Sequence, residues 1–148
     1  MNKPENLPPT GLPRRAASMI YDALLVAALW MVAAAIVVIP AGTEIQPGNP
    51  AFQFYLLVVW YLYFAICWRV GGQTLGMKAW RIRLVTVDTQ RPGWGQITVR
   101  FLFAGVSLGC LGLGFIWTLF DRESRSWHDM ISGTRLVLLP RKRGTNAW

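Results

Sequence analysis

Long apolar runs dominate the pattern of this sequence. The first run, residues 16–39, contains one charged side chain, Asp22, and ends at Pro40. The second run, residues 52–68, contains no charge and has aromatic side chains near both ends. At about 1.5 Å per residue, runs of roughly 17 to 24 residues reach across much or all of a hydrocarbon core of about 30 Å. We therefore predict two transmembrane helices.

A third apolar run, residues 97–120, is also long enough to cross a bilayer, but glycines interrupt it. Each glycine inside a helix costs up to about 1 kcal/mol of helix propensity. Two geometries follow: a plain third crossing, or a helical hairpin that enters and returns, broken within residues 109–114 and shielded from lipid by the other two helices. The glycines of this run are Gly105, Gly109, Gly112 and Gly114.

Two short segments outside the apolar runs have the pattern of β-strands. "WRIRLVTVD" (80–88) and "TRLVLLP" (134–140) are rich in β-branched residues and partly alternate. Open strand edges cannot lie in lipid, so the two strands should pair with each other on one side of the membrane. This favours the hairpin. The expected fold is an α-helical membrane protein with two transmembrane helices, a glycine-rich third membrane segment and a small cytoplasmic two-stranded sheet.

The basic residues are placed as the positive-inside rule expects. The chain carries a net charge of +8, and its basic residues flank the apolar runs, whereas the connection 41–51 contains only Glu44. The rule makes both chain ends cytoplasmic. We divide the chain into an N-terminal tail (1–13), a membrane domain (14–139) and a basic tail (140–148) near anionic lipid headgroups. Basic residues precede the first run, lie between residues 69 and 91, and follow the third run: Lys3, Arg14, Arg15, Arg69, Lys78, Arg81, Arg83, Arg91, Arg122, Arg125, Arg135, Arg141, Lys142 and Arg143.

Several other classes of protein do not fit the sequence. The aromatic residues lie inside the apolar runs and do not alternate with basic residues, which argues against nucleic-acid binding. "GGQTLGMK" (71–78) has Met77 where a phosphate-binding loop needs lysine. Cys67 and Cys110 suggest neither a disulfide framework nor a thiol-bound metal. Since no nucleophile, base and oxyanion site can be recognised together, we expect no enzyme, no cofactor and no metal.

Asp22 needs compensation if it lies in the cytoplasmic third of the bilayer. An ionised carboxylate at the bilayer centre costs about 2.5–3.5 kcal/mol on insertion scales, and less at this depth. Arg15 is nearly on the same helix face, but its side chain should lean toward the headgroups. Better partners come from elsewhere in the chain: Arg100, Lys78, and the hydroxyls of Tyr61 and Tyr63.

The segment after the third run offers Asp121, His128 and Asp129. These could form a metal or acid–base cluster. We prefer a simpler interpretation, in which His128 is a solvated or hydrogen-bonded group at the membrane surface. Asp129 then caps a short helical turn or pairs with Arg15.

Arg15, Asp22 and Asp129 together give the chain a recognisable pattern. With "GGQTLGMKAWRIRLV" (71–85), Arg100 in "TVRFL" and "LFDRESRSWHD" (119–129), the sequence resembles the RDD family over residues 13–138. A common family pattern has lysine where this chain has Met77. The resemblance implies a small multi-pass protein of the bacterial inner membrane, for which ion or solute transport has been suggested, and points to a charged cluster of Arg15, Asp22, Arg100 and Asp129.

Two functions remain open from the sequence. In the first, Asp22 exchanges a cation or proton, in a homo-oligomer because one chain offers few polar groups across the outer half of the bilayer. In the second, the charges only fix the fold of a membrane scaffold or interaction module. Gly105 and Gly109 form a G-x-x-x-G pattern that would allow close helix approach, between chains or against residues 33–35 of the first helix.

Overall fold

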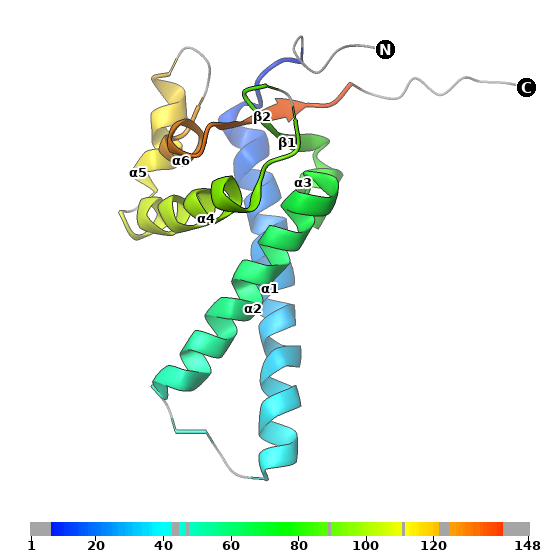
Figure 1. Cartoon of the computed structure of the whole chain (residues 1–148), viewed down its shortest axis with the longest axis vertical. Helices are drawn as coiled ribbons and strands as arrows, with labels where there is room; N and C mark the ends of the chain where they lie inside the picture. The colour runs from blue at the N-terminus through cyan, green and yellow to red at the C-terminus, as the bar shows by residue number, and fades with distance from the viewer. Residues whose placement is uncertain are drawn as a thin grey trace, which may run out of the picture.

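The computed structural model describes residues 7–42, 45–46, 48–88, 90–110, 112–121 and 125–140. Glu44, Lys3 and the basic tail 141–148 lie outside these residues. Two long helices, α1 (Leu12–Ala41) and α2 (Pro50–Gly71), form a stalk (Figure 1). The remaining elements form a cap at one end of it: α3 (Leu75–Ala79), β1 (Ile82–Thr86), α4 (Trp94–Gly109), α5 (Leu113–Ile116), η2 (Trp117–Leu119), α6 (Trp127–Ile131) and β2 (Thr134–Leu138).

The stalk confirms both of the long helices that were expected. α1 has 30 residues and α2 has 22, and each is long and apolar enough to cross a membrane. α2 begins where the Asn49 side chain accepts hydrogen bonds from the backbone N–H groups of Ala51 and Phe52. Large apolar side chains of both helices are exposed, which suits a helix pair surrounded by lipid: Ile20, Leu24, Met31, Val32, Ile36, Ile39, Phe54, Leu57 and Ile66.

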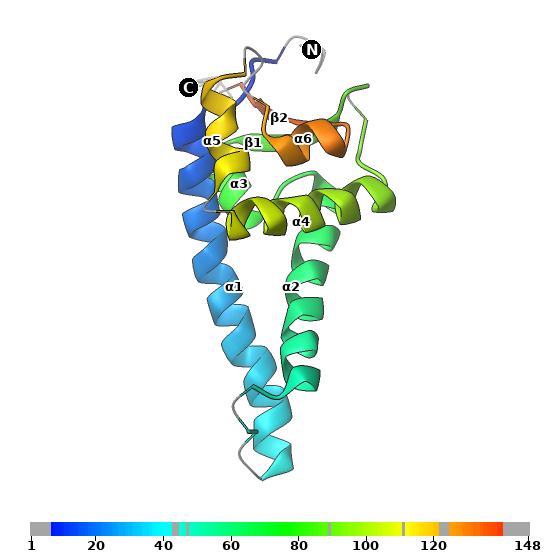
Figure 2. The ribbon, with the colours of Figure 1, turned by 90° about the vertical axis from the view of Figure 1, so that its left-hand side faces the viewer.

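Aromatic side chains join the two stalk helices. Trp30 donates from its indole to the carbonyl of Leu56 at 3.1 Å, and its ring meets Trp60 edge-on at 5.8 Å. Tyr55 donates to the carbonyl of Ala33 at 3.3 Å. Nearer the cap the helices separate, and α4 lies across them there (Figure 2).

The two predicted strands pair with each other, as expected. β1 and β2 are antiparallel, with Leu84 opposite Leu136 at the centre. The segment before α1 runs along the other side of β2, where Thr10 donates its backbone N–H to Leu136 at 3.2 Å. On the β1 side, Leu84 donates to the carbonyl of Gly72 at 2.7 Å. Covering both edges in this way protects so short a sheet from further pairing.

The third apolar segment breaks where predicted but does not lie where predicted. α4 ends at Gly109, and Gly112 (φ +76°) turns the chain into α5. α4 lies across the stalk in both views and does not run beside α1 and α2 (Figures 1 and 2). The expected shielding by the stalk is wrong, because Leu102 and Val106 are 59% and 60% exposed. α4 turns Ile97, Arg100 and Ser107 toward the protein and leaves the side with Leu102 and Val106 exposed.

A small apolar core joins the cap to the stalk. It forms where the end of α2 meets α3, the sheet and α4, from Ala65, Trp68, Met77, Ile82, Leu84 and Ile97. The glycines of α4 do not pack against α1, since a Cβ added at Gly105 or Gly109 would meet nothing within 4 Å. Of the two alternatives for these glycines, between chains or against residues 33–35, the second is therefore not found.

Candidate functional site

Two buried carboxylates lie where the cap meets the first half of α1. Asp22 is on α1 itself, whereas Asp129 comes from α6. Both are at least 95% buried, as are Arg15 and Arg100. An ionised group that is buried so deeply must be paired or fully hydrogen-bonded. The two carboxylates meet this requirement in different ways.

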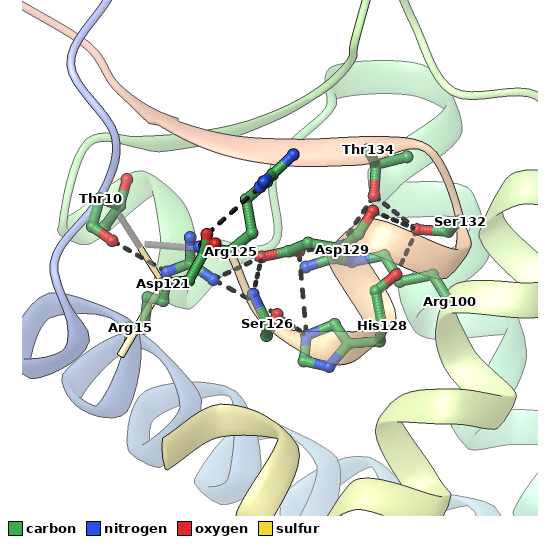
Figure 3. Close-up of polar contacts among 10 residues, drawn as sticks. All are labelled: Thr10, Arg15, Arg100, Asp121, Arg125, Ser126, His128, Asp129, Ser132 and Thr134. Atoms are coloured by element: carbon green, nitrogen blue, oxygen red, sulfur yellow. Dashed lines mark hydrogen bonds and ion pairs between the residues drawn. The ribbon is translucent and has the colours of Figure 1, made fainter. Parts of the chain in front are cut away.

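Asp129 lies between two arginines (Figure 3). The Nη1 group of Arg15 donates to Oδ2 of Asp129 at 2.6 Å, and Nη1 of Arg100 donates to its Oδ1. The backbone N–H of Ser126 also donates to Oδ2 at 3.0 Å, so that Asp129 caps the start of α6. One side chain therefore connects α1, α4 and α6.

The two arginines have further partners in the cap. Nε of Arg15 donates to the carbonyl of Thr10 at 2.9 Å, which holds the segment before α1. Nη1 of Arg100 donates to the hydroxyl of Thr134 at 2.9 Å, at the start of β2. The guanidinium of Arg100 also lies 5.4 Å from the ring centre of Trp68, within the range of a cation–π contact. These contacts extend the charged cluster to both β2 and α2.

Burial and the charges of the two arginines shift the pKa values of Asp129 and His128. Burial alone would raise the pKa of Asp129, but the charges of Arg100 and Arg15 outweigh it and hold that pKa well below its usual range. Burial, with the charge of Arg100, lowers the pKa of His128 to about 3. At neutral pH the cluster therefore contains two cations, one carboxylate and a neutral imidazole.

Asp22 is compensated by three neutral donors. The hydroxyl of Tyr63 on α2 donates to its Oδ1 at 3.0 Å, and the backbone N–H of Gly76 donates to the same oxygen at 3.0 Å. The hydroxyl of Thr74 donates to Oδ2 at 2.5 Å. These three hydrogen bonds satisfy both oxygens of a buried carboxylate that has no cation beside it.

The segment between α2 and β1, which contains α3, packs closely against Asp22. Thr74 caps α3 by accepting from the backbone N–H of Met77 at 3.1 Å while its own hydroxyl proton points to Asp22. Gly76 allows the close approach: a Cβ there would lie 2.9 Å from Cγ of Asp22 and still closer to the carbonyl oxygen of Ser18. "GGQTLGMK" therefore not only leads from α2 into β1 but also binds α1.

The structure brings together three of the four residues that the sequence predicted as a charged cluster. Arg15, Arg100 and Asp129 are in direct contact, whereas Asp22 forms a separate site. Tyr63 was expected to be a partner of Asp22 and is one. Arg100 instead pairs with Asp129.

The other expected partners of Asp22 lie elsewhere. The hydroxyl of Tyr61 is hydrogen-bonded to Thr98 of α4 at 2.8 Å. Lys78 has an exposed side chain, and among the described residues no hydrogen bond or ion pair joins it to Asp22. Neither residue therefore compensates the carboxylate.

Asp121 and His128 differ in burial and in the side chains that they contact. Asp121 forms an ion pair with Nε of Arg125 at 3.2 Å on a partly exposed surface. His128 is 2% exposed, with Nε2 2.9 Å from the hydroxyl of Ser126. Of the two alternatives predicted for His128, solvated or hydrogen-bonded, the structure has the hydrogen-bonded one. Within the described ranges, no three or more His, Cys, Asp or Glu side chains come together in a group that could hold a metal ion.

Sequence reasoning missed five residues of these sites: Thr10, Thr74, Gly76, Ser126 and Thr134. For Ser126 a signal existed, because Ser126 and Asp129 have the spacing of a helix capping box. Thr74 has a similar position before a short helix. The other contacts join segments that are far apart in the sequence, so no local sequence pattern predicts them.

The chain was also compared with known protein families. The sequence pattern of the RDD family matches residues 9–133. The chain belongs to the RDD family. Family membership and the two apolar helices indicate a membrane protein. Neither a curated protein nor a solved structure was found to match the chain. In this RDD protein, Arg15, Asp22 and Asp129 are all buried contacts between α1 and the cap.

Proposed function

We propose that this RDD protein is a multi-pass scaffold or interaction module of the bacterial inner membrane, with its cap in the cytoplasm. The observation that supports this role is that both buried carboxylates are occupied by donors from the chain itself: three for Asp22, and two arginines and a backbone N–H for Asp129. Carboxylates and arginines that are bonded in this way hold the cap in one position on the stalk.

The far half of the stalk adds support. Beyond Asp22, residues 23–39 of α1 are only Ala, Leu, Val, Ile, Trp and Met. A pathway for an ion needs polar groups at successive depths. One copy of this chain offers few of them among its described residues away from the cap.

The orientation can be tested with a reporter. Residues 8–10 and β2 are hydrogen-bonded to each other, so that both ends of the described chain lie at the cap. A reporter active only in the cytoplasm, fused after Trp148, should be active in intact cells. A fusion that is active only outside the cytoplasm would contradict both the orientation and the placement of the cap.

A second candidate function is exchange of a cation or proton at Asp22. Among the described residues, Asp22 is the one fully buried carboxylate without a cation beside it. It also borders a cavity of about 310 Å³ between α1, α2 and α4. A transport role would require more than one copy of the chain to complete the route.

Asp22→Asn separates the two candidates, with Asp88→Asn as the matched change at an exposed carboxylate. For a scaffold, Asp22→Asn lowers thermal stability, and proteoliposomes of neither parent nor variant show pH-dependent cation flux. For a transporter, the parent shows flux and Asp22→Asn abolishes it while folding and oligomeric state persist. Flux in the parent that Asp22→Asn leaves unchanged would contradict both proposals for Asp22.

A further inference from the structure

One side of α4 is apolar and exposed. The sequence from Gly93 to Phe120 contains a single charged residue, Arg100, and its side chain is only 4% exposed. Leu102 lies about 200° around the helix from Arg100 and is 59% exposed, and Val106 on the next turn is 60% exposed. The other large apolar side chains exposed on this helix are Trp94, Phe103 and Leu108. An uncharged apolar surface of this kind marks contact with lipid or with another protein.

Contacts with α2 show the depth at which α4 lies. The ring of Phe101 on α4 meets those of Trp60 and Tyr61 edge-on, with ring centres 5.3 Å and 5.4 Å apart. Trp60 and Tyr61 are the eleventh and twelfth of the 22 residues of α2. Since α2 is long and apolar enough to cross a membrane, its middle should lie near the centre of the hydrocarbon layer. The side chain of Phe101 therefore reaches into that layer.

The direction of α4 is across the stalk in both views (Figures 1 and 2). Its 16 residues extend over about 24 Å. A helix of this length that ran along the stalk would pass through most of the hydrocarbon layer, whereas one that runs across it stays at a similar depth. α5 then leads from the end of α4 back toward the level of the sheet (Figure 2).

The turn between α4 and α5 keeps its described backbone N–H groups bonded within the chain. Cys110 donates to the carbonyl of Val106 at 2.9 Å. Gly112 donates to the carbonyl of Ser107 at 2.8 Å, and Leu113 donates to that of Cys110 at 3.2 Å. Backbone donors that face hydrocarbon must be satisfied by the chain itself, because no water is present there. This turn is therefore compatible with a position next to lipid.

The exposed side of α4 continues the apolar surface of the stalk. Met19 of α1, Leu57 of α2 and Leu102 of α4 border one cavity, and each is at least 37% exposed. The surface around that cavity thus consists of apolar side chains from three helices. In a membrane the stalk helices contact acyl chains, and the same chains can reach the side of α4 that faces away from the cap.

We propose that α4 is embedded in the plane of the membrane, in the leaflet on the cap side, and that acyl chains of this leaflet cover its side with Leu102 and Val106. The opposite side, with Arg100, holds the cap, so α4 attaches the cap to the membrane as well as to the stalk. Lipid takes the place that the sequence prediction gave to the stalk helices as the cover of this segment. The proposal rests on the membrane location of the protein and is independent of whether the protein is a scaffold or a transporter.

Nitroxide labels measure the depth of α4 in proteoliposomes of phosphatidylethanolamine and phosphatidylglycerol. The full-length protein, with Cys67→Ala and Cys110→Ala, receives one label at Val106→Cys. The control is Val87→Cys, because Val87 is similarly exposed (65%) but follows β1 in the sheet. The label at position 106 should collide with oxygen, which is concentrated in hydrocarbon, and should lose nearly all collisions with a water-soluble nickel chelate. The label at position 87 should show the reverse.

Two outcomes of this measurement overturn the proposal. The first is equal access of the nickel chelate to both positions, which would place this side of α4 in water. The second is a label at position 106 that is shielded from both reagents and broadened by a second label nearby, which would show that another copy of the chain covers this side.

A second label tests whether α4 lies in the plane of the membrane. Gly95 and Val106 are eleven residues apart, which places them within about 20° of each other around the helix and about 16 Å apart along it. A Cβ at Gly95 meets nothing within 4 Å, so Gly95→Cys can be labelled without a clash. The labels at Gly95→Cys and Val106→Cys should differ in depth by much less than their separation. A difference in depth close to that separation would mean that α4 crosses the leaflet, and would overturn the proposal.

A glutamate substitution distinguishes lipid from water without labels. Glu is a better helix former than Val, so on a helix in water Val106→Glu would be neutral or slightly stabilising. A carboxylate among acyl chains is costly, so Val106→Glu should lower the midpoint temperature of unfolding in lipid nanodiscs by several degrees. Val87→Glu is the control and should leave that temperature nearly unchanged. Equal midpoint temperatures of the two variants would overturn the contact of α4 with lipid.

Discussion

The buried carboxylates Asp22 and Asp129 show two solutions to one electrostatic problem. Asp129 is neutralised by two arginines, and those charges keep its pKa low in spite of burial. Asp22 accepts hydrogen bonds from a phenol, a threonine hydroxyl and a backbone N–H. The first solution depends on charge, whereas the second depends on the exact position of α3 against α1.

The contact at Gly76 predicts a large effect of a very small change. Gly76→Ala would place a methyl group 2.9 Å from Cγ of Asp22 and against the carbonyl of Ser18, and would push α3 away from α1. We expect the free energy of unfolding in detergent micelles to fall by about 1–3 kcal/mol. Gly71→Ala, whose Cβ meets nothing within 4 Å, is the control and should not destabilise. Equal stability of the two variants would contradict the close approach of α3.

His128 should make stability depend on pH in a narrow range. It is the single histidine of the chain, and its folded pKa of about 3 lies below the value of about 6.5 in an unfolded chain. Between these values the unfolded state binds the extra proton, so that acid destabilises the fold, by up to about 1.4 kcal/mol per pH unit. Stability should therefore fall steadily from pH 6.5 to pH 5.

The measurement is chemical or thermal unfolding at pH 5.0, 5.5, 6.0 and 6.5. His128→Gln removes the titrating group and should show nearly the same stability across this range, even if it is less stable overall. A slope that survives in His128→Gln would mean that another group is responsible.

Some residues of these two sites could be predicted from the sequence, and others could not. The need to compensate Asp22 followed from one carboxylate in an apolar run, and Tyr63 was one of the partners predicted for it. Thr74 and Gly76 did not follow, because their role depends on a single turn returning against α1. Arg100 was assigned to the wrong carboxylate, since only the three-dimensional arrangement shows that α6 brings Asp129 closer to it.

At the scale of elements, the periodic segments were predictable and the direction of the interrupted one was not. α1, α2, β1 and β2 follow from uninterrupted apolar runs and from alternation. For the glycine-rich segment the sequence located the break but not the path. α4 lies across the stalk because one of its faces, with Ile97 and Arg100, contacts the cap. Arg100 pairs there with Asp129, which is far away in the sequence, so no local sequence pattern predicts the direction of α4.

The break after α4 depends on Gly112. Its φ of +76° is a left-handed conformation that costs other residues roughly 1–2 kcal/mol. Gly112→Ala should therefore lower the free energy of unfolding by about that amount. Gly109→Ala, in the last residue of α4 and without a nearby atom, should be neutral or slightly stabilising. The comparison is made by thermal unfolding in the same detergent. Stabilisation by Gly112→Ala would mean that the helix continues through this point.

At the scale of the whole molecule, the polar contacts are concentrated where the cap meets the stalk. Arg15, Asp22 and Ser18 occupy the part of α1 next to the cap, and the remainder of that helix is apolar. The contacts of Asp129 join α1, α4 and α6, and those of Asp22 join α1, α2 and α3. The position of the cap thus depends on a few buried polar side chains together with the small core around Trp68 and Ile82.

The ion-pair cluster predicts a non-additive result. Asp129→Leu removes the buried carboxylate that both Arg15 and Arg100 contact, and should lower the free energy of unfolding by about 3–5 kcal/mol. Replacing all three residues, with Arg15→Met and Arg100→Met added, removes the two buried positive charges together with the carboxylate. Because apolar side chains of similar volume can occupy such a site at little cost, the triple variant should be more stable than Asp129→Leu alone.

Chemical unfolding in detergent micelles measures this difference, and hydrogen exchange of the β1 and β2 amides shows whether the cap stays on the stalk. Asp121→Asn is the control, since its pair with the partly exposed Arg125 should contribute less than about 1 kcal/mol. If each added arginine replacement lowers stability further, the arginines stabilise the cap through contacts other than Asp129, and the bonds to Thr10 and Thr134 become the ones to test.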